Sequence, residues 1–328
     1  MILFRKPPRP EPDDVPVSSL QKMIGLAIVT AFLWILWGPG SPLAGRGEPS
    51  ARPDGPPPVP APRVASTSPA ITDTLVDLGL VEHLVGRSAY CTGVPAAMPV
   101  VGDLRSFDAE RLALVDPDIL FVQPPLAGVD PALAAHCEKL GIAIVAQRLD
   151  SLADLSTLVA AIGAAMPEAG LEAARADRLE ARVTEARRTI AGTDLVAGGA
   201  ADDDPGAAEG RGTPAVLLLL AADPFLVAGA GGYLDELLRR GGARNASSAE
   251  GYSELAAEAV VALAPEVVVG VVASADGAAR MREAIAALPW PEGRAPRVAV
   301  AAEPALLAPS LRAVARGSRL ADLVREAR

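Results

Sequence analysis

The chain has 328 residues, half of them hydrophobic, which is enough apolar material for a sizeable core. Its 30 Lys and Arg against 40 Asp and Glu give a formal net charge of −10, the wrong sign for a protein that neutralises nucleic-acid phosphates. Two cysteines and two histidines, with no CxxC pair, exclude a zinc ribbon, a disulfide-dense scaffold and a three-histidine metal cage, so no metal or cofactor is expected.

The first distinctive segment is an uncharged apolar stretch, residues 23–37. As a helix it would reach roughly 22 Å, which is typical of a signal peptide and short of a bilayer core of about 30 Å. However, residues 1–22 are long and acidic for the start of a signal, and Trp34 and Trp37 suit a membrane interface. We expect an uncleaved membrane anchor, with a cleaved signal as the alternative, and either places the remaining chain outside the cytoplasm.

The rest of the chain divides by composition. Residues 38–62 are rich in Pro and Gly and predict a linker that cannot form a core. After it, short apolar strands alternate with helices, the first of which has Ser68 as its N-cap and Pro69 at its first position. The predicted folded parts are an N-terminal lobe over 63–150, a helical bridge over 151–192, a flexible Gly-rich loop over 193–213 and a C-terminal lobe over 214–328.

A repeat links the two lobes. The segment "SFDAERLALVDPDILFV" at 106–122 returns in thinned form as "SELAAEAVVALAPEVVVGV" at 253–271. In each copy a glutamate, Glu110 or Glu258, stands seven residues ahead of a proline that ends the helix before a buried strand. Continuous apolar strands alternating with helices predict an α/β fold of two lobes, each a parallel sheet flanked by helices, joined by one long rigid helix.

These motifs, in this order, carry a resemblance: "RVASTSPAITDTLVDLGLVEHLVGRSAYC", "FDAERLALVDPDILFVQ", "DPFLVAGAGGYLDELLRRGGARN" and "GYSELAAEAVVALAPEVVV". From Arg63 to the C-terminus, apart from 193–213, the chain resembles the extracytoplasmic binding proteins of ABC importers for vitamin B12, heme and ferric siderophores. The resemblance implies a monomer that captures a bulky metal chelate between two lobes and delivers it to a membrane permease. It implies no catalysis.

The resemblance also assigns a role to the repeated glutamates. In relatives the acidic residue on this helix of each lobe docks against arginines of the permease, and Glu110 and Glu258 occupy those positions. The alternative is that both are ordinary solvated glutamates, which the helix dipole favours in a first turn.

Three aromatic residues fall where the resembling proteins line their ligand cleft. Tyr90 follows the second strand of the first lobe, Phe225 follows the first strand of the second lobe, and Tyr252 precedes its acidic helix. Aromatic rings in such loops stack on flat ligands, although each could instead fill the core. Leu104 stands where some B12 binders place a tryptophan, and this difference weakens the case for a corrin ligand.

Two further residues complete the expected cleft. Arg105 could meet an anionic ligand group, although lone arginines are usually solvated. Cys91, next to Tyr90, could be a cleft thiol, a metal ligand or one half of a disulfide with Cys137.

Two other functions are conceivable for a chain with this pattern. The sequence "GAGGYL" at 229–234 lacks the third glycine of a dinucleotide fingerprint, and no hydrolase or P-loop motif is present. An enzyme on a similar two-lobe scaffold, as in nitrogenase-like proteins, would need cluster-binding cysteines, and two are too few. A membrane-anchored sensor or scaffold with this fold and no transport role stays as the alternative function.

Overall fold

The computed structural model describes residues 62–166, 173–192 and 213–327. The predicted segments 1–22 and 23–37, the linker up to residue 61 and the loop 193–213 up to residue 212 lie outside the described residues. Among the helices that the structure describes, none is both long and apolar enough to cross a membrane.

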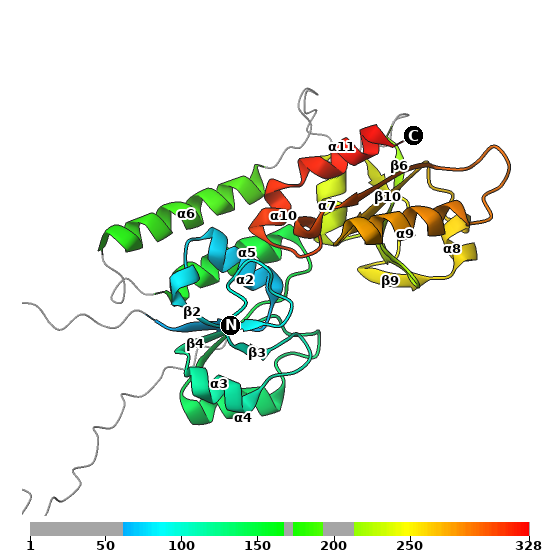
Figure 1. Ribbon diagram of the computed structural model, residues 1–328. Coiled ribbons are helices and arrows are strands. Elements are labelled where there is room, and N and C mark those ends of the chain that lie inside the picture. The colour runs from blue at the N-terminus through cyan, green and yellow to red at the C-terminus, as the bar shows by residue number, and fades with distance from the viewer. Residues whose placement is uncertain (1–61, 167–172, 193–212, 328) are drawn as a thin grey trace, which may run out of the picture. The chain divides into compact units, whose positions relative to one another are not determined.

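The N-terminal lobe is built on a five-stranded parallel sheet (Figure 1). Its strand order is β3-β2-β1-β4-β5, with β1 at Val64–Ser66, β2 at Leu84–Ser88, β3 at Val100–Gly102, β4 at Ile119–Val122 and β5 at Ala143–Ala146. The crossovers are α2 (Pro69–Asp77) with a 3-10 turn (Val81–His83), α3 (Ala109–Val115) and α4 (Pro131–Leu140). The predicted parallel sheet flanked by helices is therefore confirmed for this lobe.

Alternate residues of β4 explain why the sheet is covered on both faces. Leu120 and Val122 pack in one cluster with the buried residues of α3 and α4, whereas Phe121 packs in another with those of α2 and α5 (Leu152–Ala165). Because neighbouring side chains of a strand point to opposite faces, a wholly apolar strand needs two layers of helices. Figure 1 shows these layers on either side of the sheet.

Local capping sets where the helices of this lobe begin. The side chains of Ser68, Asp108 and Asp130 accept hydrogen bonds from backbone amides in the first turns of α2, α3 and α4. Each cap satisfies an amide that lacks a partner within its own helix.

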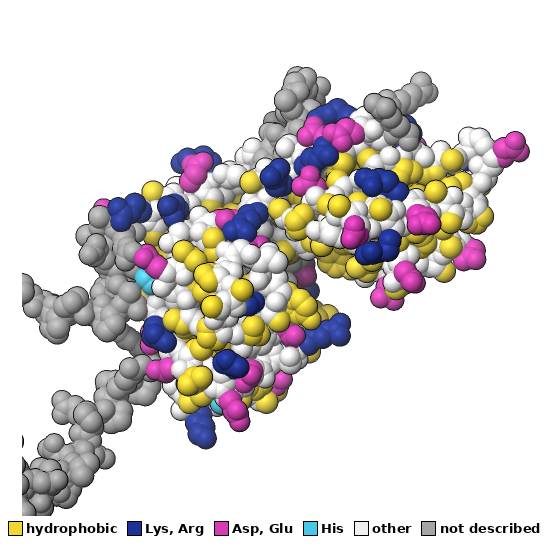
Figure 2. Space-filling model, in the orientation of Figure 1, with side chains coloured by type: hydrophobic (Ala, Val, Ile, Leu, Met, Phe, Trp, Pro, Cys, Tyr) yellow, Lys and Arg dark blue, Asp and Glu magenta, His cyan; other side chains and the backbone are white. Residues whose placement is uncertain are grey.

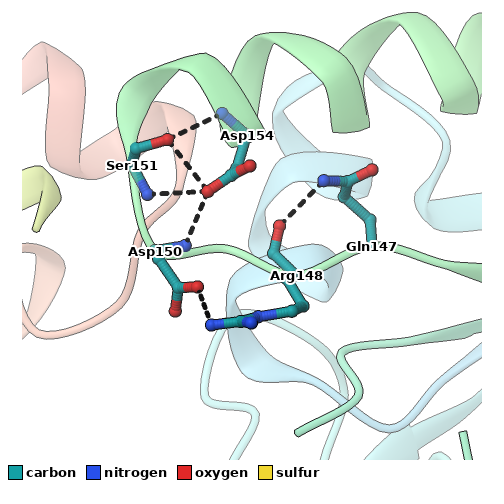
Figure 3. Close-up of polar contacts among 5 residues, drawn as sticks. All are labelled: Gln147, Arg148, Asp150, Ser151 and Asp154. Carbon is teal, nitrogen blue, oxygen red and sulfur yellow. Dashed lines mark hydrogen bonds and ion pairs between the residues drawn. The ribbon is translucent and has the colours of Figure 1, made fainter. Parts of the chain in front are cut away.

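The predicted bridge contains two helices, α5 and α6 (Ala173–Ala191), which pack against each other. A capping box opens α5: the Ser151 hydroxyl accepts from the Asp154 amide at 3.1 Å, and the Asp154 carboxylate accepts from the Ser151 amide at 3.0 Å (Figure 3). Leu155 and Ile162 of α5 lie in one core cluster with buried residues of both sheets, such as Phe121 and Leu218. This helix therefore belongs to the core of both lobes.

The C-terminal lobe has a mixed sheet in the order β11-β10-β6-β7-β9, with β8 also paired to β6. The strands are β6 (Ala215–Ala222), β7 (Phe225–Ala228), β8 (Arg244–Asn245), β9 (Tyr252–Leu255), β10 (Val267–Val272) and β11 (Arg297–Ala302). The helices are α7 (Tyr233–Arg240), α8 (Ala257–Ala262), α9 (Ala275–Ala286), a 3-10 turn (Pro304–Leu306), α10 (Leu311–Ala315) and α11 (Ser318–Glu326).

The two-lobe α/β fold is confirmed, with one difference in this second sheet. Strands β6, β8, β10 and β11 pair in parallel, but β7 runs antiparallel to both β6 and β9. Only Asp223 and Pro224 separate β6 from β7, and so short a connection can form a hairpin but not the crossover that a parallel pair needs. The expectation of a fully parallel C-terminal sheet was therefore wrong at this edge.

The sequence repeat is also a repeat of backbone conformation. Asp116 and Ala264, which directly precede Pro117 and Pro265, have φ values of 42° and 46°. Left-handed backbone is uncommon for residues other than glycine, and the residue before a proline is already disfavoured in a right-handed helix. In both lobes this pair ends the helix, and the buried strand begins two residues after the proline.

Candidate functional site

A hollow of about 390 Å³ lies at the carboxyl ends of the strands in the N-terminal lobe. Its lining comes from Thr67, the loop 103–107 after β3, and the segment 122–131 after β4. Ligands of open α/β sheets bind at this edge, so the hollow is the part of the lobe best placed to receive one.

The loop after β3 is held rigidly. The Asp103 carboxylate accepts hydrogen bonds from the backbone amides of Arg105 and Ser106, at 2.8 and 2.9 Å, and from the Ser106 hydroxyl at 3.2 Å. The two backbone hydrogen bonds lower the pKa of Asp103 below its ordinary range, because they favour the charged form. Gly102 has φ of 149°, and a Cβ there would lie 2.5 Å from the Ser106 carbonyl, so the turn requires glycine.

This rigid loop presents two residues singled out by the sequence. Arg105 and Leu104 both line the hollow and are both exposed. An apolar side chain beside a guanidinium suits a ligand that combines an apolar body with an anionic group.

A second loop, residues 88–98, carries Tyr90 and is called the Tyr90 loop below. Arg87 closes this loop by donating from its guanidinium to the carbonyls of Met98, Ser88 and Ala96, at 3.2, 2.9 and 3.0 Å. The Tyr90 side chain is 69% exposed. Because the loop is closed from within, a solvated tyrosine is held on a defined backbone.

Cys91, the next residue, points the other way. It is only 8% exposed, and burial raises the pKa of its thiol. Cys91 and Cys137 are both free thiols in this structure, so the disulfide left open by the sequence does not form here. Cys91 is buried, and contact between its thiol and a ligand stays a prediction.

The aromatic residues of the C-terminal lobe are placed differently from each other. Tyr252 begins β9 and is 53% exposed. Phe225 was expected in a loop, but it is the first residue of β7, is 8% exposed and packs in the hydrophobic cluster with Leu219 and Val227. Its large apolar ring contributes to the core of this lobe, and its contact with a ligand stays a prediction.

The Tyr252 hydroxyl has a buried neighbour, Tyr233, that sequence reasoning did not identify. It interacts with the hydroxyl of Tyr233, which is 1% exposed and donates a 2.6 Å hydrogen bond to the Leu306 carbonyl. Burial raises the pKa of Tyr233 well above its ordinary value, so this phenol stays protonated at neutral pH. Tyr233 thus joins the start of α7 to the 3-10 turn at 304–306, next to Tyr252.

The segment before α5 lies beside this tyrosine pair and joins the lobes. The Tyr233 amide, at the start of α7, donates to the Asp150 carbonyl at 2.8 Å, and the Leu152 amide, at the start of α5, donates to the Glu236 carboxylate at 3.2 Å. The N-termini of α5 and α7 therefore cap each other. In Figure 3, the Asp150 side chain turns away from the capping box to form an ion pair with Arg148.

The two repeated glutamates are exposed in the first turns of α3 and α8. Within the described residues, neither the Glu110 nor the Glu258 carboxylate forms an ion pair. On the face shown in Figure 2, acidic and basic side chains are interspersed with hydrophobic ones. Docking through these two carboxylates stays a prediction.

Sequence reasoning missed the segment 123–131, which supplies much of the hollow. Gln123 accepts a 2.7 Å hydrogen bond from the Ser68 hydroxyl and is followed by Pro124 and Pro125. The signal that could have found it is positional, because "QPPLAG" directly follows strand β4 at the ligand-binding edge of a parallel sheet. No group of three or more His, Cys, Asp or Glu side chains within the described ranges could hold a metal ion.

Comparison with known proteins agrees with this architecture. A curated vitamin B12-binding protein of Vibrio cholerae is 29% identical over 121 residues, a match that spans 36% of this chain and 43% of that protein's length. A periplasmic heme-binding protein, BhuT, solved with two hemes, has a TM-score of 0.62 at 27% identity. The match covers 80% of this chain and 99% of the BhuT chain. A periplasmic heme-binding protein of Pseudomonas aeruginosa has a TM-score of 0.58 at 27% identity. The match covers 82% of this chain and 94% of that protein's chain. Residues 64–289 match the periplasmic binding protein family, and the chain belongs to that family.

Proposed function

We propose that this protein captures a bulky metal chelate outside the cytoplasm and delivers it to an ABC importer. The observation that carries the proposal is the pair of exposed tyrosines, Tyr90 and Tyr252, one in each lobe. Only 3% of the residues are aromatic, so an exposed tyrosine at the expected cleft position of each lobe supports a role in stacking on a flat ligand.

Within that class we favour heme, with cobalamin and ferric siderophores as the alternatives. The two solved relatives at 27% identity are named for heme, and a porphyrin offers two flat faces for stacking. Leu104 occupies a position where a tryptophan would favour a corrin by stacking on it, so the leucine counts against cobalamin. Arg105, exposed beside it on the rigid loop, is suited to pair with a carboxylate at the edge of the ligand.

The proposal also includes its partners and place in the cell. Glu110 and Glu258 would dock against basic residues of the permease, one from each lobe. The apolar stretch 23–37 would anchor the protein to the membrane, and the folded part would act as a monomer.

Tryptophan fluorescence provides the test. In the full chain carrying W34F and W37F, Trp290 is the sole tryptophan, and its indole nitrogen donates a 3.0 Å hydrogen bond to the Ile285 carbonyl. Hemin, cyanocobalamin and a ferric hydroxamate absorb where tryptophan emits, so the chelate that binds should quench Trp290 saturably.

Variants of the two tyrosines locate the site. Tyr90→Ala and Tyr252→Ala should each weaken binding by roughly three- to tenfold, as expected for loss of an aromatic contact of about 0.5–1.5 kcal/mol. Val81→Ala is the matched control, because Val81 is also exposed but lies before β2, at the opposite edge of the sheet. If no chelate binds with a Kd below about 1 mM, the sensor or scaffold function replaces this proposal.

A further inference from the structure

The Tyr90 loop is also held from outside, by a residue far along the chain. Arg312 lies on α10, and its Nε donates to Asp77 at 3.0 Å while its Nη1 donates to Asp73 at 3.1 Å. Asp73 and Asp77 are four residues apart on α2, so both carboxylates lie on one face of that helix. One guanidinium therefore joins a C-terminal helix to the first helix of the N-terminal lobe.

This ion pair contacts the Tyr90 loop at Gly93. A Cβ on Gly93 would lie 2.7 Å from Nη1 of Arg312 and 2.9 Å from the Asp73 carboxylate, distances that no side chain tolerates without movement. The loop backbone therefore packs directly against the paired charges. Two residues earlier, the buried Cys91 thiol lies beside the hydroxyl of Thr72, the neighbour of Asp73 on α2.

Removing the guanidinium would leave two neighbouring carboxylates without it, and one of them, Asp73, lies against the loop. The Asp73 side chain is only 18% exposed, and that of Asp77 only 25%. Burial raises the pKa of Asp73, and the Asp77 carboxylate raises it further, whereas Arg312 opposes the shift. Without Arg312 these groups would have to take up protons or move into water, and Gly93 packs against the atoms that would move.

We propose that Arg312 is a positioning residue for ligand binding: its ion pair with Asp73 holds the Tyr90 loop in the conformation that presents Tyr90. Arg87 closes the loop internally, and Arg312 fixes it to α2. The ligand part of this inference rests on the proposed function, but the holding of the loop can be measured without any ligand.

The reactivity of Cys91 reports the state of the loop. In the full-length protein, Ellman's reagent should label Cys91 slowly, because the thiol is buried, and a Cys91→Ala variant labelled in parallel isolates the contribution of Cys137. Arg312→Met should speed Cys91 labelling by about tenfold, since local opening governs access to a buried thiol. It should also weaken the chelate affinity by a similar factor. In both labelling rate and affinity, Arg312→Lys should lie between Arg312→Met and the parent.

Asp77→Asn is the matched control. It removes the Nε partner of Arg312 but leaves the Nη1 contact with Asp73, which is the contact that touches Gly93. Its labelling rate and affinity should stay within about twofold of the parent, as is usual for a partly exposed charge pair. Equal effects of Asp77→Asn and Arg312→Met would overturn the specific role of the Asp73 contact.

Gly93→Ala keeps the proposal testable if Arg312→Met does not fold. It leaves all three charged residues in place but inserts a methyl group between the loop and the ion pair, so Cys91 labelling should again accelerate. Parent-like labelling in both variants overturns the inference, and so does faster labelling with unchanged chelate affinity. If the parent binds no chelate, the proposed function fails, while the labelling rates still decide whether Arg312 holds the loop.

Discussion

The Tyr233 amide and the Asp150 carbonyl are joined by a 2.8 Å hydrogen bond that connects the two lobes at the start of α7. Glu236, on the same turn of α7, accepts from the Leu152 amide at the start of α5. At the other end of α7, Arg240 donates to the Ile190 carbonyl at 2.6 Å, near the end of α6. Helix α7 is therefore hydrogen-bonded to both helices of the bridge. This arrangement limits movement of one lobe relative to the other.

Glu236→Ala should lower the free energy of unfolding by about 1 kcal/mol, the usual effect of losing a side chain that caps a helix N-terminus. The reason is that the amide of buried Leu152 would lose its partner at the lobe junction. Urea unfolding measures the change. Glu283→Ala, at an exposed position of α9, is the control and should change stability by less than about 0.5 kcal/mol.

The double variant Glu110→Ala with Glu258→Ala should bind the chelate with parent affinity but support at least tenfold less uptake. Losing one partner of an interfacial charge pair typically costs about 2–5 kcal/mol, whereas these carboxylates are predicted to face the permease rather than the ligand. Uptake by cells that express the importer provides the measurement.

Glu138→Ala with Glu283→Ala is the matched control for this experiment, because it removes one exposed glutamate from each lobe at positions outside the repeat. Loss of chelate binding in the Glu110 and Glu258 variant would place these residues in the ligand site and contradict the docking role.

Asp103 should stabilise the protein in a way that depends on pH. Its folded-state pKa is lowered from 3.8, so its stabilising effect is fully present above the unfolded-state pKa and is lost as pH falls through the folded-state pKa. The difference in unfolding free energy between the parent and Asp103→Asn should therefore be constant above about pH 5 and shrink below about pH 4. Urea unfolding of both proteins across this pH range measures the difference in unfolding free energy. A difference that stays the same at the acid end contradicts the prediction.

Gly270→Ala should destabilise the C-terminal sheet by about 1–3 kcal/mol, the usual cost of overpacking a core. Gly270 lies in β10, and its added Cβ would meet Met281 Sδ at 2.3 Å and Val300 Cγ1 at 2.9 Å. Thermal unfolding reports the loss. Gly277→Ala, in the first turn of α9, meets nothing closer than 3.3 Å and should be neutral or slightly stabilising, because alanine favours a helix.

Local features of this chain could be predicted because the residues that determine them are neighbours in sequence. Ser68 with Pro69 predicted the start of α2, and the spacing of Glu110 and Glu258 from their prolines predicted that both helices end just before Pro117 and Pro265. Caps, prolines and apolar runs act over a few residues, so they are legible without the fold.

Only the tertiary structure decided which distant residues meet. It placed Phe225 in the core rather than in a loop, put the free Cys91 thiol on the inner side of the Tyr90 loop, and turned β7 antiparallel. The contact of Arg312 with Asp73, across 239 positions, leaves no periodic trace in the sequence. Such contacts depend on how helices and sheets stack to bury apolar surface, which is a property of the whole packed chain rather than of any one segment.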